Sequence, residues 1–288
     1  MMITEADAPR LLPAFRGKKG LLLFRLAMKI TGLDKANLLH DRVEKSGAKP
    51  GADFAHGLLE DCGIDFAIGN PERLEQLPEG PFIVIANHVY GHIDGICLVD
   101  LIAHKRPAAK VMVNEFLMWV KGISDNFIAV NPLTDNGGGA TPASIGGIRQ
   151  ALAQLHSGEP LCIFPSGAVA DIKPREGWTL SEREWQDSAI RLIRKARVPI
   201  VPIRFFDSNS RFYYLLGLLD YRIRFVRLFH ELWNKRGSHP RLGIGPTISP
   251  EQQDAVSEAD FGAFLRSSVY DMPLPGEFTY RSQLWKKE

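Results

Sequence analysis

The spacing of hydrophobic residues divides this chain into two parts. Before residue 63, apolar positions recur every three to four residues, which predicts helices over residues 20–31, 34–46 and 52–62. Asp34 stands at the expected start of the second helix, where its side chain suits an N-cap. Residues 1–19 hold two prolines and the basic stretch RGKKG, so we expect a loose segment there. Residues 1–62 are therefore predicted to form an N-terminal helical segment.

From residue 63 onward, short apolar runs predict strands. They are rich in β-branched residues and are bounded by glycine, proline or polar residues. In chain order the candidates are IDFAIG, FIVIA, KVMV, FIAV, LCIF, VPIVPIRF and PRLGIG. Helical patterns fill the intervals at residues 92–104, 141–156, 181–197 and 250–272. This alternation predicts an α/β fold with a mostly parallel or mixed central sheet flanked by helices.

Polar residues mark the starts of two of these helices. Ser181 and Glu184 form a capping-box pattern, and Ser249 precedes a proline at the first helical position. We expect residues 63–249 to form the α/β domain, and residues 250–288 to form a C-terminal helix and tail packed on it.

Composition and charge narrow the classes of function. The 288 residues are 45% hydrophobic, enough to bury the core of one large domain with a small appendage. The net charge is +2, and no basic run with interleaved aromatic residues matches a nucleic-acid-binding motif, so nucleic acid is not an expected partner. Three cysteines form no CxxC pair, which fits a reducing cytosol: Cys62, Cys97 and Cys162.

No apolar run has the length of a membrane span. The nearest, residues 21–30, is interrupted by Arg25 and Lys29, and the first residues lack the form of a cleavable signal peptide. We therefore expect no signal peptide and no transmembrane helix. Contact with a membrane is expected to be peripheral, at the cytoplasmic face of the inner membrane.

The segment HVYGHID, residues 88–94, is the part of the chain richest in chemistry. It lies between the apolar run PFIVIA and a helical pattern, so His88 stands where a buried strand meets a helix N-terminus. Gly91 lets the chain fold back, so Asp94 can hydrogen-bond one ring nitrogen of His88 and leave the other as a base. An aspartate in the first turn of a helix is also common as a cap. The residues alone leave both interpretations open.

A metal site is an alternative use of the same segment. His88, His92 and Asp94 offer three ligands within seven residues. Gly91, however, interrupts the helix that a His-x3-His pair needs, and no other cluster of His, Cys or Asp supplies a second anchor. A bound metal is therefore not expected.

Two other loops are candidates for chemistry. The stretch NPLTDNGGGATPASIGG has neither GxGxxG nor GxxxxGK[ST], so we expect a flexible surface loop that could cover a cleft. FPSG, residues 164–167, follows the strand candidate LCIF. Ser166 is outside a GxSxG elbow, which argues against a nucleophilic serine. The end of a parallel strand would place it at the same sheet edge as His88.

Four motifs together resemble the glycerolipid and lysophospholipid acyltransferase family. NHVYGHIDG is similar to the family's Asn-His…Asp signature and FIAVNP to its middle motif. FPSGAVAD is similar to its Phe-Pro-Glu-Gly motif and VPIVPI to its apolar strand that ends in proline. They follow the family's order over residues 80–205. The continuation to about residue 250, including ELWNKRG, resembles the hemolysin-like branch related to enzymes of bacterial ornithine- and glycine-lipid synthesis.

The resemblance implies an acyltransferase in which His88 and Asp94 activate an acceptor hydroxyl. A fatty acyl group would pass from acyl carrier protein or coenzyme A, as co-substrate, to a lysolipid, without a cofactor. Backbone amides near Gly91 and near Ser166 and Gly167 are candidates for the oxyanion site. The substrate-binding residues expected from the motifs and their surroundings are Asn87, Gly91, Asn131, Phe164, Pro165, Ser166, Gly167, Lys173 and Arg175.

Departures from the family pattern bear on the acceptor. Five residues separate His88 from Asp94 where the family usually has four, a spacing that the hemolysin-like branch shares. Asn131 replaces the middle motif's arginine, and FPSGAVAD lacks both the family's glutamate and the Thr-Arg-Ser that follows it. Because bidentate phosphate recognition normally uses arginine, we expect a lyso-aminolipid acceptor in preference to lysophosphatidate.

The segment 211–236 is dense in aromatic residues and arginines. Such aromatic residues usually fill a core, but here they outnumber what one helical face can bury. Aromatic and basic residues together also suit a lipid headgroup layer. We therefore expect a membrane-docking surface that includes Phe212, Tyr213, Arg222, Arg224 and Arg227.

Two other classes of function remain open. One is a metal-dependent hydrolase that uses His88, His92 and Asp94. The other is a non-catalytic lipid-binding protein with the same fold. Bound metal in the pure protein would favour the first, and tight lysolipid binding without turnover would favour the second.

Overall fold

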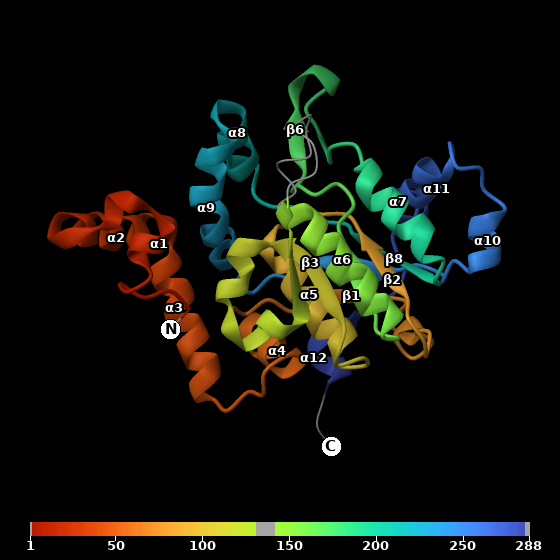
Figure 1. Ribbon diagram of the computed structural model, residues 1–288, viewed down its shortest axis with the longest axis horizontal. Coiled ribbons are helices and arrows are strands. Elements are labelled where there is room, and N and C mark those ends of the chain that lie inside the picture. Colours follow the sequence, from red (N-terminus) through yellow and green to blue (C-terminus); the bar gives the residue numbers. More distant parts are fainter. Residues whose placement is uncertain (1, 131–141, 286–288) are drawn as a thin grey trace.

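The β-branched runs of the sequence form a central sheet that is eight-stranded in the described part of the chain (Figure 1). The computed structural model describes residues 2–130 and 142–285, except the side chains of residues 142–144, 221, 222 and 225. The order across the sheet is β10-β1-β9-β8-β2-β5-β3-β4. The strands are β1 (Ala67–Gly69), β2 (Ile83–Ala86), β3 (Lys110–Asn114), β4 (Phe127–Val130), β5 (Leu161–Ile163), β8 (Ile200–Phe205), β9 (Arg241–Ile244) and β10 (Thr279–Tyr280).

Neighbouring strands are parallel except at two places. β10 runs antiparallel to β1, and β9 runs antiparallel to β8. A separate antiparallel hairpin, β6 (Asp171–Lys173) and β7 (Thr179–Ser181), projects beside the sheet. The α/β fold with a mostly parallel, mixed sheet flanked by helices is confirmed.

Helices surround the sheet. The α-helices are α1 (Ala8–Leu11), α2 (Gly17–Thr31), α3 (Leu33–Lys45), α4 (Ala52–Asp61), α5 (His92–Ala103), α6 (Pro142–His156), α7 (Asp187–Ala196), α8 (Arg211–Leu219), α9 (Tyr221–Asn234), α10 (Pro250–Asp254), α11 (Phe261–Tyr270) and α12 (Arg281–Leu284). The 3-10 helices are η1 (Pro13–Phe15), η2 (Pro71–Leu74), η3 (Glu115–Trp119), η4 (Lys121–Asn126) and η6 (Pro174–Glu176).

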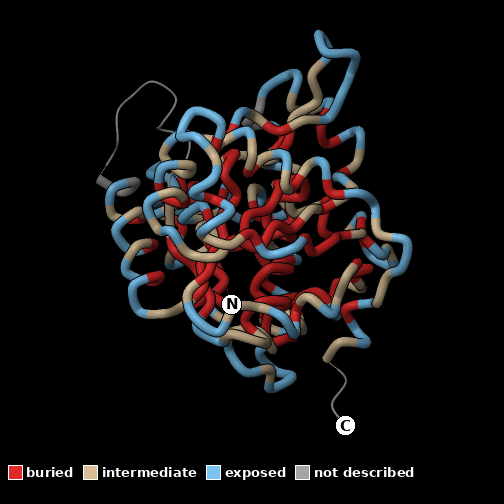
Figure 2. The backbone as a smooth tube through the Cα atoms, turned by 90° about the vertical axis from the view of Figure 1, so that its right-hand side faces the viewer, coloured by how far each residue is buried: buried red, intermediate tan, exposed pale blue. Residues whose placement is uncertain are grey.

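Alternate residues of β2 face two different helical layers. Val84 and Ala86 belong to a buried cluster that includes residues of α4 and α5. Ile83 and Ile85 belong to a second cluster with residues of α6, α7 and α11. A strand buried on both faces explains its uninterrupted apolar run, and Figure 2 shows the buried backbone gathered in the middle of the molecule.

Residues 2–19 are folded against the N-terminal helices, so the expectation of a loose segment is wrong for the described part. Asn37 of α3 holds the start of the chain, since its side-chain amide bonds both the N–H of Ile3 (2.9 Å) and the C=O of Ile3 (2.6 Å). Phe15 of η1 packs edge-on against Phe24 of α2. In Figure 1, α1, α2 and α3 form a lobe to one side of the sheet.

Two predicted helices differ from those observed. The helix expected at 181–197 begins only at Asp187, because Ser181 pairs with the β6 strand in the hairpin. The helix expected at 250–272 is divided into α10 and α11. Between them the Ser257 hydroxyl donates to the Asp260 carboxylate (2.6 Å) and accepts the Asp260 N–H (3.2 Å), so the chain turns before α11 begins at Phe261.

Of the two other predicted helix caps, one is wrong and one is confirmed. Asp34 lies in the first turn of α3, and the N-cap is Gly32 in the left-handed conformation (φ 77°), so the Asp34 cap is wrong. Ser249 caps α10 as predicted, its hydroxyl accepting the Gln252 N–H at 3.3 Å. The cysteine thiols are free and buried. Among the described helices, none combines the length and apolarity needed to cross a membrane.

Candidate active site

The site begins where β2 ends. Asn87 follows the last residue of β2, and its side-chain amide hydrogen-bonds the backbone of β8 as a neighbouring strand would. It accepts the Phe205 N–H (2.7 Å) and donates to the Phe205 C=O (2.8 Å). Asn87, expected to bind substrate, therefore has both polar ends engaged in holding the strand exit. This fixes the position of the next residue, His88.

Gly91 allows the chain to turn into α5. Its φ of 87° and ψ of −118° favour glycine, and a Cβ there would lie 3.0 Å from Leu228 Cδ1. Asp94, three residues later, accepts the N–H groups of Tyr90 (2.9 Å) and Gly91 (3.0 Å) with the same carboxylate oxygen. The capping interpretation of Asp94 is therefore correct, and its oxygen is held in one place by the backbone.

That oxygen also contacts His88. The distance from His88 Nδ1 to Asp94 Oδ2 is 2.8 Å, and Asp94 is fully buried. An Asp94 carboxylate that accepts the Nδ1 proton leaves Nε2 of the neutral ring as the acceptor nitrogen. The two interpretations that the sequence left open thus occur together, with one carboxylate both capping α5 and orienting His88.

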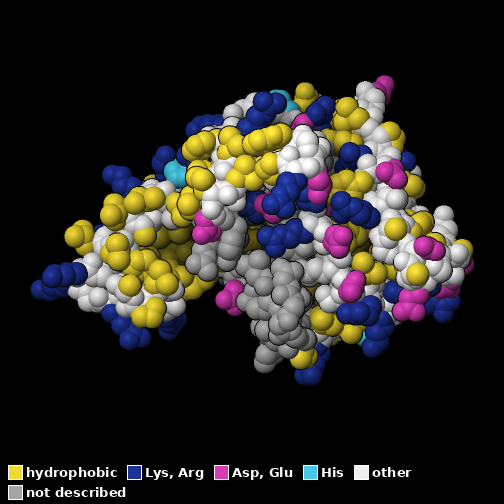
Figure 3. Space-filling model, turned by 90° about the horizontal axis from the view of Figure 1, so that it is seen from above, with side chains coloured by type: hydrophobic (Ala, Val, Ile, Leu, Met, Phe, Trp, Pro, Cys, Tyr) yellow, Lys and Arg dark blue, Asp and Glu magenta, His cyan; other side chains and the backbone are white. Residues whose placement is uncertain are grey.

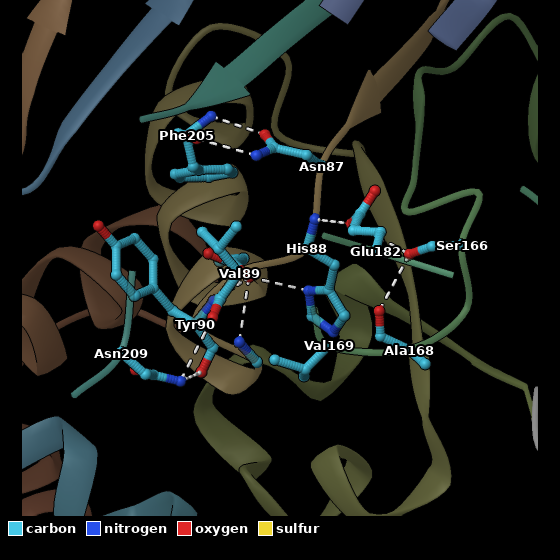
Figure 4. A network of polar contacts seen from close by, with 12 residues as sticks. Asn87, His88, Val89, Tyr90, Ser166, Ala168, Val169, Glu182, Phe205 and Asn209 are labelled. Atoms are coloured by element: carbon cyan, nitrogen blue, oxygen red, sulfur yellow. Dashed lines mark hydrogen bonds and ion pairs between the residues drawn. The ribbon is translucent and has the colours of Figure 1, made fainter. Parts of the chain in front are cut away.

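The His88 ring is packed on one side and open on another. Phe164 stacks against it, with ring centroids 4.3 Å apart and planes inclined by 27°. The side chain keeps 18% exposure and lines a cavity. Figure 4 shows the ring next to Val169, with Ser166 and Glu182 on its backbone side.

Glu182 is a site residue that the sequence reasoning missed. Its buried carboxylate accepts the His88 backbone N–H, the Ser166 hydroxyl (3.1 Å), the Trp185 indole N–H (3.2 Å) and the Tyr270 hydroxyl (2.5 Å). These donors come from four separate segments of the chain. Glu182 lay within the helix expected at residues 181–197, and no local pattern reveals that His88, Ser166 and Tyr270 are its partners.

The FPSG segment supports the histidine mainly by packing. The carbonyl of the buried Pro165 accepts the Gln186 N–H (2.9 Å), and Ser166 is buried, with its hydroxyl directed at Glu182 and Ala168. Of the four residues, Phe164 and Gly167 line the cavity. The Gly167 N–H donates to Phe164 C=O (3.0 Å), so this amide, like that of Gly91, already has an acceptor. The amides of Gly91 and Gly167 themselves are therefore already engaged, which leaves their neighbours as the backbone candidates.

The cavity is large enough for a lipid chain. Its volume is about 440 Å³, and most of its lining is apolar. Walls come from β3, η3, α5, α7 and α9, and from the junction of α2 and α3. Residues that line it beside His88 include Met112, Val113, Phe116, Leu117, Leu192, Leu228 and Phe229.

His92 adds a polar group to this apolar space. It is 5% exposed, lines the cavity and packs against Phe229 with ring centroids 5.1 Å apart. Neither of its ring nitrogens has a hydrogen-bond partner among the described residues. Burial lowers the pKa of His92 to about 3, so the ring is neutral near pH 7.

The alternative metal site does not form. Within the described chain, the donor atoms of His88, His92 and Asp94 are not gathered around a common point. The group that lies within 4.8 Å is His40, Asp41 and Glu44 on α3. This geometry counts against the hydrolase that would use the first three residues.

The two basic residues expected to bind substrate do not lie at the cavity. Lys173 and Arg175 belong to the β6–β7 hairpin; Lys173 approaches Glu176 at 3.4 Å, and neither residue lines the cavity. Asn131 lies outside the described residues. The arginines that do line the cavity are Arg183 and Arg224.

The predicted docking residues separate into exposed and buried ones. Phe212 is 54% exposed, and Arg227 lies 5.3 Å from its ring centroid. Tyr213 and Arg224 are buried, so the expected exposure is wrong for both. The side chain of Arg222 lies outside the described residues. The sequence could not separate these positions because α8 and α9 pack against each other and on the hairpin.

A family model described as acyltransferase matches residues 15–273, which includes every element of the site. The chain belongs to the acyltransferase family. The resemblance noted in the motifs is thereby confirmed, and the protein is assigned as an enzyme of this class.

Two relatives of this acyltransferase are named lyso-glycine lipid O-acyltransferase. The one from Bacteroides thetaiotaomicron is 23% identical over 252 residues, which cover 85% of this chain and 87% of the relative. The one from Phocaeicola vulgatus is 24% identical over 279 residues, 92% of this chain and 94% of the relative. The similarity therefore extends over most of each protein.

Proposed function

We propose that this acyltransferase moves a fatty acyl group from a thioester to the free hydroxyl of a lyso-aminolipid. The observation that carries the proposal is the His88–Asp94 pair at the wall of an apolar cavity of about 440 Å³. The thioester is carried by acyl carrier protein or coenzyme A. The names of the two relatives support a lysolipid acceptor of the glycine class.

The reaction follows from the position of His88. Nε2 removes the proton of the acceptor hydroxyl while the oxygen attacks the thioester carbonyl carbon. The C–S bond then breaks, and the proton on Nε2 passes to the departing thiolate, so ester and free thiol are formed. Asp94 keeps the proton on Nδ1 and stabilises the imidazolium between these steps. Neither a covalent acyl-enzyme nor a cofactor is required.

His92 is our candidate for the group that binds the thioester carbonyl. The backbone amides expected at Gly91 and Gly167 already have acceptors, whereas the buried His92 ring has none in the described chain. A neutral imidazole can donate one hydrogen bond to an oxygen that gains negative charge. Ser166 instead bonds Glu182 and Ala168, which supports a structural role and not a nucleophilic one.

An acyl-transfer assay on the purified protein tests the proposal. Acyl carrier protein and coenzyme A thioesters are each offered with an N-(hydroxyacyl)glycine or with lysophosphatidate, and products are identified by mass spectrometry. We expect an ester on the aminolipid and much less on lysophosphatidate. The reverse preference would contradict the proposed acceptor. Tight lysolipid binding without any product would favour the non-catalytic alternative.

We also propose that the enzyme docks peripherally on an anionic membrane through two apolar helix faces. On α2, Leu22, Leu26 and Ile30 recur every four residues and are 53–69% exposed. On α8, Phe212 and Leu219 are 54% and 77% exposed. Figure 3 shows apolar side chains gathered over the N-terminal lobe and over a ridge beside it.

Charge and position both support this surface. Exposed basic residues flank the apolar face of α2, namely Lys18, Lys19, Arg25 and Lys29. Each basic residue near an anionic surface contributes about 1 kcal/mol. The end of α2 reaches the cavity at Thr31, and Ile30 C=O contacts His230 of α9 at 2.9 Å. Docking there would bring the cavity to the lipid that it must take up.

Vesicle sedimentation tests the docking surface. Leu22→Glu with Leu26→Glu should weaken binding to anionic vesicles, and binding of the wild type should fall as salt rises. Leu274→Glu is a matched control, because Leu274 is 51% exposed but lies outside these two faces. Unchanged sedimentation of the folded double variant would exclude the α2 face.

A further inference from the structure

The cavity contains two fixed positive charges and no lining carboxylate. Among its described lining residues, Arg183 and Arg224 are the side chains that stay charged at all physiological pH values, and none is Asp or Glu. Lipid chains need no charge, so these arginines are unexpected in an otherwise apolar lining. Their presence indicates that the ligand carries an anionic group.

Arg224 is held rigidly. Its side chain is 6% exposed and donates to the C=O of Ala170 (3.1 Å) and of Val169 (3.4 Å) and to the Asp171 carboxylate. The guanidinium carbon also lies 5.4 Å from the ring centroid of Tyr213. Because packing and hydrogen bonds fix it before any ligand arrives, Arg224 adds a preorganised charge to the wall.

Arg183 is the more accessible of the two. Its side chain is 39% exposed, and its Nε lies 3.5 Å from the second oxygen of Asp171. Asp171 thus stands between two guanidinium groups and neutralises only one of them. Among these three side chains, the guanidinium groups outnumber the carboxylate by one.

This charge lies close to the general base. The N–H of Ala170 donates to the backbone C=O of His88 at 2.8 Å, and the C=O of Ala170 accepts from Arg224. One residue therefore links the histidine to the arginine. His88, Arg183 and Arg224 line the same cavity, so a ligand with its hydroxyl at His88 can place an anionic group at the arginines.

We infer that Arg183 and Arg224, held together by Asp171, bind the carboxylate of the acceptor. This inference rests on the proposed function and specifies the headgroup. A glycine acylated on its amino group keeps a free carboxylate, and a guanidinium matches a carboxylate with two parallel N–H donors. The phosphates of a coenzyme A or carrier-protein arm offer the same anionic oxygens, so the source of the anion has to be tested.

A pair of acceptors isolates the carboxylate. The N-(hydroxyacyl)glycine and its glycinamide have nearly the same shape, but only the first carries a charge. With acyl-coenzyme A held constant, the wild type should prefer the glycine. Arg183→Gln should lower kcat/KM for the glycine about 10- to 100-fold, mainly through KM, and should change the glycinamide reaction little.

Three further variants sharpen the result. Arg183→Lys should lie between wild type and Arg183→Gln, because it keeps the charge but loses the planar fork. Asp171→Asn should lower KM for the glycine, since it removes the competing carboxylate. Arg191→Gln is the matched control: Arg191 is exposed on α7 and does not line the cavity, so neither acceptor should be affected.

The donor is varied separately. Acyl-coenzyme A is replaced by an acyl-pantetheine thioester, which lacks phosphates, with the glycine acceptor held constant. If the Arg183→Gln defect disappears with the phosphate-free donor, the arginines bind the donor and the inference is overturned. Equal loss with both acceptors would also overturn it.

A binding measurement keeps this inference distinct from the proposed function. Calorimetry with His88→Ala protein compares the glycine and glycinamide lipids without turnover. Preference for the glycine that Arg183→Gln removes would support the carboxylate site even if the wild type transferred no acyl group. Equal binding of the two lipids would exclude the site even if the wild type were active.

Discussion

Helix α5 carries two buried aspartates that both contact histidines, yet their surroundings differ. Asp94 stands in the first turn, and Asp100 lies in the second half of the helix; both are fully buried. Asp94 bonds His88 and two backbone N–H groups. Asp100 contacts His56 (3.3 Å), His104 (3.2 Å) and Arg281 (3.2 Å).

The two aspartates differ in what surrounds the histidines that they contact. His88 lines the cavity, so its second nitrogen can reach a ligand. His104 instead approaches Asp53 with Nε2 (3.5 Å) and stacks on Trp285 at 4.3 Å. His56 lies with one nitrogen, Nδ1, near both Asp100 (3.3 Å) and the Arg281 guanidinium (2.6 Å). A carboxylate–histidine pair is thus equipped for proton transfer only where a cavity adjoins the histidine. At Asp100 the same groups tie α4, α5 and α12 together.

The strongest test removes the histidine that faces the cavity. His88→Ala should lower kcat by a factor of about 10²–10⁴, because the proposed general base is lost. Circular dichroism and Tm should stay close to wild type, since Asp94 keeps the N–H groups of Tyr90 and Gly91 as donors. His156→Ala, at an exposed position on α6, is the control. A folded His88→Ala protein within a few-fold of the wild-type rate would contradict the mechanism.

The next test removes the structural aspartate. Asp100→Ala should lower the free energy of unfolding by about 3–5 kcal/mol, because Arg281 becomes a buried charge without its partner. Urea unfolding followed by fluorescence measures this loss. Activity per folded molecule should change little at a temperature where the variant is folded. A large fall in kcat with unchanged stability would show that the two aspartates do not differ as described.

A third test changes only the charge of the cavity-side aspartate. Asp94→Asn keeps the shape but no longer accepts the Nδ1 proton strongly, so the wrong ring nitrogen becomes the acceptor. We expect kcat to fall about 100-fold or more, with stability reduced less than in Asp100→Ala. Dialysis of the wild type against a chelator should leave activity unchanged. Loss on chelation and recovery with zinc would support the metal alternative instead.

The smallest effect concerns pH. Burial alone lowers the pKa of His104, but its hydrogen bonds to Asp100 outweigh this and raise the pKa above its ordinary value. A raised pKa in the folded state stabilises the protein below the unfolded pKa of about 6.5, and the contribution disappears as pH rises through the folded pKa. The difference in unfolding free energy between wild type and His104→Gln should therefore shrink from pH 6 to pH 9. A constant difference would show that the protonated ring contributes nothing.

The sequence predicted the parts of the fold that depend on local pattern. Every strand in the middle of the sheet could be recognised from its β-branched run, because β2 and its neighbours are buried on both faces. The hairpin at residues 171–181 could not. Its strands are half exposed and short, and Ser181 with Glu184 imitates a helix start.

The candidate active site could likewise be predicted only where its residues are close in the sequence. His88, Asp94 and Gly91 could be predicted because they interact across six residues of one turn. Glu182 and Arg183 could not, since their partners are brought together only by the packed hairpin. Arg224 was noticed as a charge but assigned to the surface. A list of residues does not say which arginine meets Asp171 in the folded chain.

The placement of β1 has a consequence for how the chain is made. Its neighbours in the sheet are β9 and β10, which lie near the other end of the sequence. During synthesis β1 therefore leaves the ribosome long before any strand that can pair with it. Until then its hydrogen-bonding edges and its apolar side chains stay open to other nascent chains. The pairing of β1 with β9 can form only after synthesis has passed Ile244, so the growing chain has a period in which β1 is open to aggregation or to a chaperone.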